Sequence, residues 1–230
     1  ALPMLIVNSI AQANDFPTAA PEDVGVSSER LQRLSSTMQR YIDSNMLAGT
    51  VSLVSRNGKV IHVESQGWKN KESNEPMTDD SIFVIMSMTK PIVSTALMML
   101  YEEGNFLLTD PITDWIPELK GKQVVIEEDG TNYRMSAHRP ITFRHVLSHT
   151  AGVDPSREVL TEEELALLPR KATLEETLIN RAPLPLSFHP GDDWQYGSST
   201  DYVALLVERI SGQSLVDYLQ EKILDPLKMH

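Results

Sequence analysis

The sequence predicts a mixed α/β (α+β) protein in which an antiparallel sheet is flanked by helices and joined to a largely helical region. Three observations lead to this prediction. Residues 27–45 carry a helical repeat of apolar residues, residues 50–65 alternate as in a β-hairpin, and the rest of the chain has repeated helix-start signals. An isolated two-stranded hairpin is only marginally stable. We therefore expect strands that lie beyond residue 230 to complete the sheet.

The first helix and the hairpin have clear boundaries in the sequence. Ser27 or Ser28 is placed to cap a helix whose apolar residues recur at helical spacing and form one face; they are Leu31, Leu34, Met38, Tyr41 and Ile42. Asn57-Gly58 then separates two β-branched, alternating runs. This dipeptide is the strongest short signal for a hairpin turn, so we expect paired strands at 50–56 and 59–65.

The later elements are mostly helices. Thr142 is placed to cap a short helix that ends near residues 149–152. Two capping boxes follow, Thr161 with Glu164 and Thr173 with Glu176. Residues 124–139 contain an Asp-Gly turn and predict an exposed hairpin, and residues 200–210 and 214–224 predict two amphipathic helices that are separated by a glycine.

These signals divide the chain into three parts. We expect residues 1–26 to be a signal-peptide remnant followed by an extended lead-in. Residues 27–67 would form the N-terminal part of an α/β sandwich domain, and residues 68–230 a mainly helical domain. The first part carries an apolar segment followed by Ala11-Gln12-Ala13, which has the small-x-small form of a signal-peptidase site. This predicts a periplasmic or secreted protein, although an apolar segment that packs on the body of the protein would look similar.

Composition excludes several classes of function. The formal net charge of −12 and the absence of a basic run argue against nucleic acid or an anionic membrane as the main partner. The N-terminal apolar segment is too short to span a bilayer. With no cysteine, thiol catalysis, disulfides and thiolate metal ligands are excluded.

One Ser-x-x-Lys motif is the first candidate for chemistry. Ser87 precedes the apolar run 92–100, near the expected N-terminus of a helix, and Lys90 lies three residues later on the same face. Backbone N–H groups and the positive end of the helix dipole would surround the serine. A desolvated lysine one turn away could accept its proton. Because serine and lysine are common, one such motif is also expected by chance in a chain of this length.

Tyr196 is the candidate for a second proton carrier. It lies between the Pro190-Gly191 turn and the start of a helix, on a loop that could face a cleft. A phenol beside an ammonium group is a reasonable general base, because the positive charge lowers its pKa. The alternative is a tyrosine that packs under its loop. Trp194, two residues earlier, would either form a wall of the cleft or serve packing.

Other arrangements are weaker. His145 and His149 have a spacing that can bind zinc, but Val146 stands where the metalloprotease pattern has glutamate. No Gly-x-Ser-x-Gly elbow is present. We therefore expect no metal site and no cofactor.

Taken together, these motifs resemble the serine hydrolases of the class C β-lactamase, penicillin-binding-protein and family VIII carboxylesterase group. The resemblance covers most of residues 27–229. The similar segments occur in the family's order; they are residues 87–90, 108–117, 141–153, 190–196 and 202–227. The resemblance implies a β-lactamase/transpeptidase-like fold with Ser87 as the acylated nucleophile, Lys90 as its proton partner and Tyr196 as the general base.

The chain departs from the family pattern at two places. The family's second motif is usually Tyr-x-Asn, whereas Ser198 holds the third position here. A hydroxyl there can still bond a substrate carbonyl but lacks the amide NH₂, so we expect an ester to be preferred. We expect Ser198 and Trp194 to contact the substrate. The family's third motif, a strand that supplies one oxyanion-hole N–H, would follow residue 230. We expect this chain alone to be poorly active and to need a C-terminal segment or chain.

Two other functions stay open. One is a β-lactamase or D-alanyl-D-alanine carboxypeptidase that acts on β-lactam or peptidoglycan amides. The other is a catalytically silent relative that binds a cell-wall ligand or a peptide in the same cleft.

Overall fold

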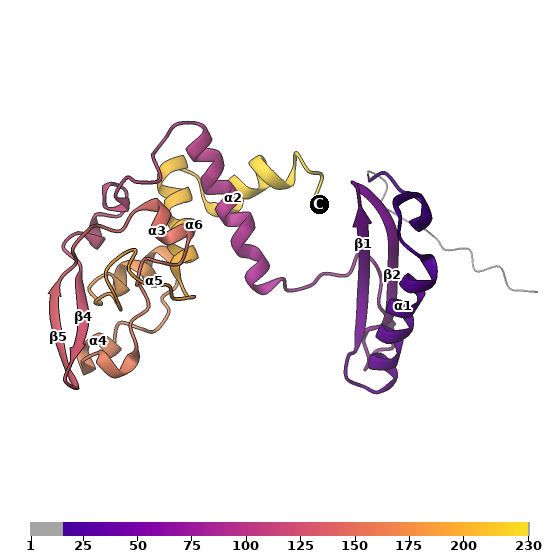
Figure 1. Ribbon diagram of the computed structural model, residues 1–230, viewed down its shortest axis with the longest axis horizontal. Helices are drawn as coiled ribbons and strands as arrows, with labels where there is room; N and C mark the ends of the chain where they lie inside the picture. Colours follow the sequence, from indigo (N-terminus) through magenta and orange to yellow (C-terminus); the bar gives the residue numbers. More distant parts are fainter. Residues whose placement is uncertain (1–15, 230) are drawn as a thin grey trace, which may run out of the picture. The chain divides into compact units, whose positions relative to one another are not determined.

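The structure, a computed structural model, describes residues 16–229, which form two compact units (Figure 1). The first unit ends at Val84 and the second begins at Ile85. The proposed signal-peptidase site, Ala11-Gln12-Ala13, lies outside the described residues, so it stays a prediction, as does the domain boundary at residue 67. Among residues 16–229, no helix is long and apolar enough to cross a bilayer.

The first unit is a small antiparallel sheet with one helix against it. The helix α1 (Ser28–Asp43) is followed by β1 (Gly49–Arg56), β2 (Lys59–Asn70) and β3 (Glu75–Pro76), in the order β1-β2-β3. Ser27 caps α1, as predicted, because its side chain accepts a hydrogen bond from the N–H of Arg30. The hairpin prediction is also confirmed: Asn57 and Gly58 have φ values of 52° and 71°, which a type I′ turn requires at both central residues.

The lead-in to this unit is attached to the sheet. Val60 of β2 donates its N–H to the carbonyl of Pro17 and accepts from Ala19, at 2.8 and 3.2 Å. A short 3-10 turn, η1 (Pro21–Val24), then leads to α1. These two hydrogen bonds hold the irregular, proline-containing lead-in against β2.

The second unit is mainly helical but contains one hairpin. Its elements are η2 (Met86–Met88), α2 (Thr89–Glu102), η3 (Ile112–Asp114), η4 (Pro117–Leu119), β4 (Gln123–Glu128), β5 (Thr131–Ser136), α3 (Phe143–Leu147), η5 (Arg157–Val159), α4 (Glu162–Leu165), α5 (Leu174–Arg181), α6 (Ser199–Ser211), α7 (Leu215–Leu219) and η6 (Gln220–Leu224). The capping boxes predicted for α4 and α5 are both present. Gly212, with φ of 71°, ends α6.

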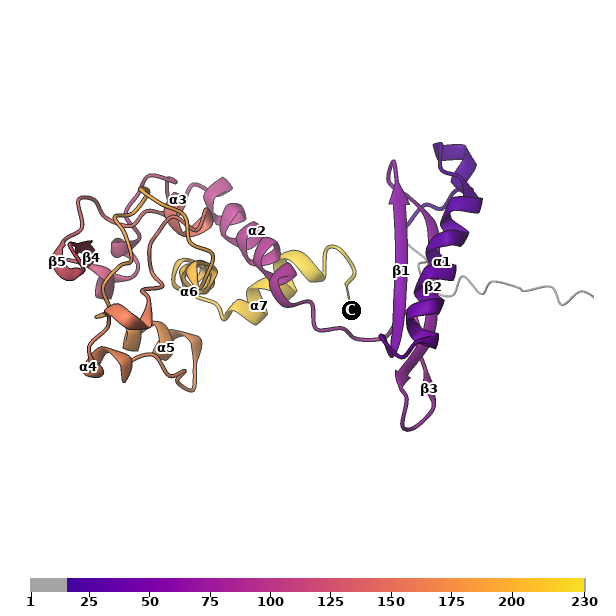
Figure 2. The same cartoon turned by 60° about the horizontal axis from the view of Figure 1, so that its bottom comes forward.

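The core of this unit lies between α2 and α6, which run side by side in the views of Figure 1 and Figure 2. Leu97 of α2 and Leu206 of α6 are fully buried. Phe143 at the start of α3 is also fully buried, and its ring stacks on that of Phe106 with a centroid distance of 3.8 Å. This packing fixes α2 and α6, the two helices next to the candidate site residues, in one rigid body.

The β4–β5 hairpin is less exposed than the sequence indicated. Val124 is fully buried and pairs with Leu186 through an isolated parallel bridge, while Tyr133 on the opposite strand is 53% exposed. The alternating pattern identified a hairpin, but it could not show that residues 182–186 cover one of its strands. The expectation of an exposed hairpin is therefore correct for β5 and wrong for the start of β4.

Lys122, just before β4, ties the hairpin to the segment after α5. Its ammonium donates hydrogen bonds to the carbonyl oxygens of Ala182, at 2.7 Å, and of Leu184. Burial lowers the pKa of Lys122 to about 8, and the Glu164 carboxylate opposes this only in part. The lysine thus caps carbonyl groups at the C-terminal end of α5. It also lines an open cavity of about 410 Å³.

This burial predicts a pH-dependent stability. Between pH 8 and the ordinary lysine value near 10.4, the unfolded state binds more protons than the folded state, so the free energy of unfolding should rise with pH by at most about 3 kcal/mol. Lys122→Met should abolish this rise, whereas Lys120→Met, at an exposed neighbouring position, should keep it. Urea denaturation across this range measures the slope. An unchanged slope in Lys122→Met would show that another group is responsible.

Candidate active site

Ser87 lies in η2, the tight turn that leads directly into α2. The residue before it, Met86, has a φ of 48°, a left-handed conformation that a non-glycine side chain adopts at a cost of about 1–2 kcal/mol. Such strain concentrates at functional sites. The turn presents Ser87 at the surface, two residues before the start of the regular helix at Thr89.

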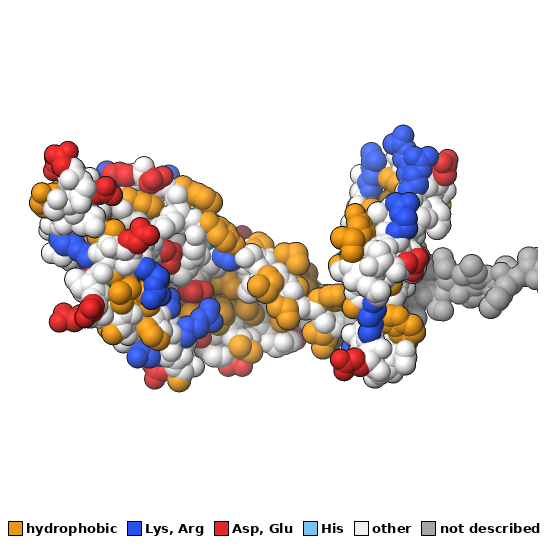
Figure 3. All heavy atoms as spheres, turned by 90° about the horizontal axis from the view of Figure 1, so that it is seen from below, with side chains coloured by type: hydrophobic (Ala, Val, Ile, Leu, Met, Phe, Trp, Pro, Cys, Tyr) orange, Lys and Arg blue, Asp and Glu red, His pale blue; other side chains and the backbone are white. Residues whose placement is uncertain are grey.

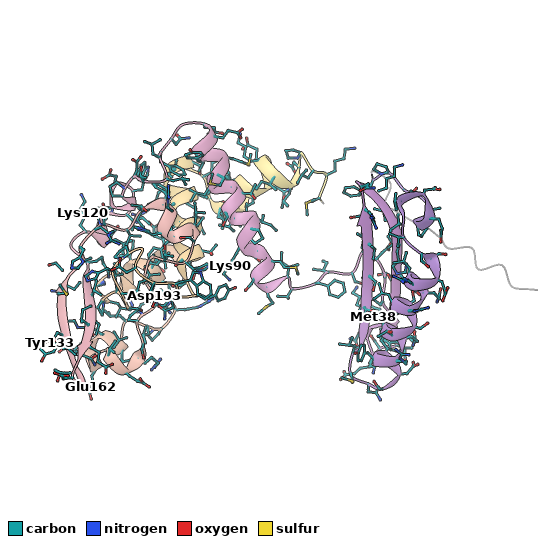
Figure 4. All side chains as sticks on the ribbon, viewed as in Figure 1. Met38, Lys90, Lys120, Tyr133, Glu162 and Asp193 are labelled. Carbon is teal, nitrogen blue, oxygen red and sulfur yellow. The ribbon has the colours of Figure 1, made fainter. Side chains whose placement is uncertain are left out.

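Two side chains donate hydrogen bonds to the Ser87 hydroxyl oxygen. Lys90 Nζ lies 3.1 Å and the Tyr196 hydroxyl oxygen 2.7 Å from Ser87 Oγ. The Lys90 ammonium also lies over the Tyr196 ring, 4.7 Å from its centroid. Figure 4 shows Lys90 projecting from the start of α2 on the side of the loop that carries Asp193. The three residues singled out in the sequence are therefore in direct contact, all within the second unit.

The loop that carries Tyr196 is held by backbone hydrogen bonds to the segment after α3. The N–H of Gly191 donates to the carbonyl of Thr150 at 2.8 Å, and that of Gln195 to the carbonyl of His149 at 2.9 Å. Gly191 has a φ of 89°, and a side chain there would come within 3.0 Å of the His145 ring, which explains the Pro-Gly turn. The loop reaches Ser87 because these bonds hold it along its length.

The charge of Lys90 changes the acidity of the phenol. A hydrogen bond with the Lys90 ammonium, and next the bond with Ser87, lower the pKa of Tyr196 below its ordinary value. Since the ring is 53% exposed, solvent screens part of this effect. The direction is the one that a general base needs.

The family resemblance implies that His149 lies at a helix end near the cleft, and its ring is beside that of Tyr196. Its ring lies 4.9 Å from that of Tyr196, and its φ of 58° marks a sharp turn after α3. Burial, followed by the nearby Lys90 charge, lowers the pKa of His149, so its ring is neutral near pH 7. Its Nδ1 is buried without a hydrogen-bond partner. An aromatic, uncharged neighbour thus packs against one side of Tyr196.

His145 does not join His149 in a common metal site. Its Nδ1 accepts a hydrogen bond from the N–H of Thr142 at 3.1 Å and so caps the first turn of α3. Within residues 16–229, no group of three or more histidine, aspartate or glutamate side chains is placed to hold a metal ion. The geometry therefore indicates that His145 stabilises the start of α3 after Thr142.

Ser198 is held by a carboxylate that the sequence analysis missed. Asp154 accepts from the Ser198 N–H at 2.8 Å and from the Ser198 hydroxyl at 2.6 Å. The hydroxyl proton is therefore used within the protein, which leaves its oxygen lone pairs as the free hydrogen-bonding capacity. The substrate contact predicted for Ser198 stays a prediction. In the sequence, Ser198 is indicated only by its position near two other motif residues. No sequence pattern indicates Asp154.

Exposed apolar side chains lie beside Ser87 in the turn and beside Tyr196. Trp194 is 60% exposed, with its ring 6.3 Å from the Tyr196 ring, and Met86 and Met88 are 75% and 65% exposed. Met86 and Met88 flank Ser87 on the turn, and both side chains are exposed. Figure 3 shows hydrophobic side chains at the surface where the chain enters α2. We call Met86, Met88 and Trp194 the apolar rim of the candidate site.

The Lys90–Tyr196 contact predicts a change in the titration of the phenol. Lys90→Met should raise the pKa of Tyr196 towards that of free tyrosine, because the hydrogen bond with the ammonium is lost. The measurement is tyrosinate absorbance against pH, with the matching Tyr196→Phe protein subtracted to isolate this residue. Lys59→Met, at an exposed position in the hairpin, is the charge-matched control. An identical Tyr196 titration in wild type and Lys90→Met would contradict the coupling.

Comparison with known proteins identifies the family. A family model described as Beta-lactamase matches residues 34–230. Esterase EstB of Burkholderia gladioli is 31% identical over 204 residues, which cover 86% of this chain and 50% of EstB. Lovastatin esterase of Penicillium rubens is 29% identical over 204 residues, 84% of this chain and 50% of that protein.

A solved structure has the same fold. EstCE1, described as a hydrolase with promiscuous acyltransferase activity, aligns with a TM-score of 0.71 and 27% identity, over 86% of this chain and 51% of EstCE1. The chain thus spans about half the length of the relatives it matches. The predicted β-lactamase/transpeptidase-like fold is confirmed. Because the family model covers most of its residues, this chain belongs to the Beta-lactamase family, together with esterases and acyl-transferring hydrolases.

Proposed function

We propose that the protein is a serine hydrolase that cleaves carboxylic esters by acyl transfer through Ser87, Lys90 and Tyr196. The observation that carries this proposal is the pair of hydrogen bonds at Ser87 Oγ, one from an ammonium and one from a phenol of lowered pKa. A serine hydroxyl is a weak nucleophile until a neighbouring group accepts its proton. Here two groups of suitable chemistry are already within hydrogen-bond distance.

In the first step, Ser87 Oγ attacks the carbonyl carbon of the ester. The Tyr196 oxygen, ionised beside Lys90, accepts the hydroxyl proton, so the direction of the observed hydrogen bond reverses. The tetrahedral intermediate then collapses, the bond to the leaving alkoxide breaks, and the phenol returns its proton to that oxygen. An alcohol leaves, and the acyl group remains on Ser87 as an ester.

In the second step, water attacks the acyl-enzyme. The Tyr196 oxygen accepts a proton from this water, and Ser87 Oγ leaves and is reprotonated, which releases the carboxylic acid. An alcohol in place of water would give a new ester by the same route. The exposure of Ser87 supports access of either acceptor, and EstCE1 is described as having both activities.

The preference for an ester is supported by the surroundings of the serine. Because the Ser198 hydroxyl donates to Asp154, this position lacks the NH₂ donor that an asparagine would offer to a substrate amide carbonyl. The apolar rim of Met86, Met88 and Trp194 suits the hydrocarbon part of an ester. Two of the similar proteins are named as esterases.

The nucleophile is tested by covalent labelling of the full-length protein. A fluorophosphonate should label the wild type once, on Ser87, and should not label Ser87→Ala. Ser36→Ala, at an exposed serine on α1 of the other unit, should react like the wild type. Peptide mapping of the labelled protein identifies the residue. Labelling of Ser87→Ala at the wild-type rate would refute this assignment, and an unlabelled wild type would favour the silent, ligand-binding relative.

The substrate class is tested by comparing p-nitrophenyl esters with a chromogenic cephalosporin and a D-alanyl-D-alanine peptide. We expect ester hydrolysis to have the largest kcat/KM. Neither Ser198 nor the apolar rim offers an NH₂ group that could donate to the carbonyl of a substrate amide. Hydrolysis of each substrate should be lost in Ser87→Ala. Faster turnover of the cephalosporin or the peptide than of every ester would overturn the ester preference and favour a β-lactamase or carboxypeptidase.

A further inference from the structure

Both carboxylate oxygens of Asp154 accept hydrogen bonds from Ser198. Oδ2 accepts from the Ser198 N–H at 2.8 Å and Oδ1 from the Ser198 hydroxyl at 2.6 Å. A carboxylate that accepts two bonds from one residue fixes both the position and the orientation of that residue. This residue stands two positions after Tyr196, at the N-cap of α6.

The carboxylate also lies against the residue between them. A side chain at Gly197 would place its Cβ 2.1 Å from Asp154 Oδ2. This distance is far inside van der Waals contact, so only glycine permits the carboxylate to lie here. Steric contact with Asp154, rather than a left-handed backbone, therefore explains the glycine in Tyr196-Gly197-Ser198.

The other side of Tyr196 is attached to the same segment. Gln195 donates its N–H to the carbonyl of His149, and its side-chain oxygen lies 3.0 Å from the Ser187 hydroxyl, which is also 2.9 Å from the carbonyl oxygen of Asp154. Residues 149–154 thus hold the chain both before and after the tyrosine. The Tyr196 ring itself is 53% exposed, so core packing contributes little to its position.

From these contacts we propose that Asp154 is a positioning residue for Tyr196. Through its two bonds to Ser198 it sets the end of the loop and so keeps the phenol oxygen 2.7 Å from Ser87 Oγ. The inference rests on the proposed function for its effect on catalysis, but the placement of Tyr196 can be measured without it. Within residues 16–229, no hydrogen bond joins Asp154 to Ser87 or Lys90, so Asp154 would act through the loop.

Charge and position predict opposite results when Asp154 is replaced. Removing an anion would by itself lower the pKa of a nearby phenol, because the tyrosinate would lose a repelling neighbour. Releasing the loop would instead raise it, because Tyr196 would move away from the Lys90 ammonium. The direction of the change therefore separates the two roles.

The first test is the tyrosinate titration of the full-length protein, with the matching Tyr196→Phe protein subtracted in each case. Asp154→Ala should raise the pKa of Tyr196. Asp154→Asn should leave it at or below the wild-type value, because asparagine can still accept from the Ser198 N–H and donate to the Ser198 oxygen, and only the charge is lost. An unchanged or lower pKa in Asp154→Ala, or an equal change in both variants, would overturn the proposal. This readout holds whether or not the protein is a hydrolase.

The second test uses the rate of fluorophosphonate labelling and the split between kcat and KM. Asp154→Ala should reduce kcat by about 100-fold with little change in KM, because a displacement near 1 Å at a reacting group has about this effect. Asp154→Asn should restore most of the loss. A labelling rate equal to that of the wild type in Asp154→Ala would refute the positioning role, whereas an unlabelled wild type would refute the proposed function instead.

Gly197→Ala supplies a second variant, and an unchanged kcat in this single variant would overturn the proposal even if Asp154→Ala does not fold. It should displace the carboxylate and lower kcat in the wild type, but it should have little further effect in the Asp154→Ala protein, where the space is free. Additive effects of the two substitutions would show that Gly197 and Asp154 do not act through one contact, which would overturn the proposal. Melting temperatures of all variants verify that each is folded.

Discussion

The structure of the site depends on one hydrogen bond between residues 109 positions apart, that of the Tyr196 hydroxyl to Ser87 Oγ. Neither partner is held by burial, because both are exposed. The bond therefore exists only because the elements beneath it are rigid: α2 packs on α6, and the loop between them is bonded to residues 149–154. The close-packed core of the second unit thus holds the Ser87 and Tyr196 side chains in position at its surface.

Electrostatics complements this geometry. Lys90 donates to Ser87 and lies over the Tyr196 ring, so a single positive charge serves both the nucleophile and the phenol. The neighbouring His149 is kept neutral by burial and by that same charge, so it does not add a second cation near Lys90. Both carboxylate oxygens of Asp154 accept hydrogen bonds from Ser198, and no ion pair joins Asp154 to Lys90 within residues 16–229. The ammonium is left available to stabilise a tyrosinate.

Features that depend on local sequence could be predicted, and features that depend on distant contacts could not. The Asn57-Gly58 turn, the capping boxes of α4 and α5 and the Ser87–Lys90 pair are set by neighbours within a few residues. The partnership of Asp154 with Ser198 spans 44 positions, and an aspartate in a loop has no pattern that announces it. The burial of Val124 likewise depends on Leu186. Tyr196 could be connected to Ser87 only through the family's motif order, and the contact between them supports that connection.

The serine at position 198 gains its meaning from the carboxylate that faces it. An asparagine here would present an amide NH₂ to the cleft, whereas the Ser198–Asp154 pair uses the polar groups of this position to fix the loop. With the proposed positioning role of Asp154, the second motif would hold Tyr196 rather than bind a substrate amide. In the proposed ester hydrolase, the apolar rim would contact the acyl group that Ser87 accepts. A departure from the family pattern that first looks like a loss is consistent with a change of substrate class.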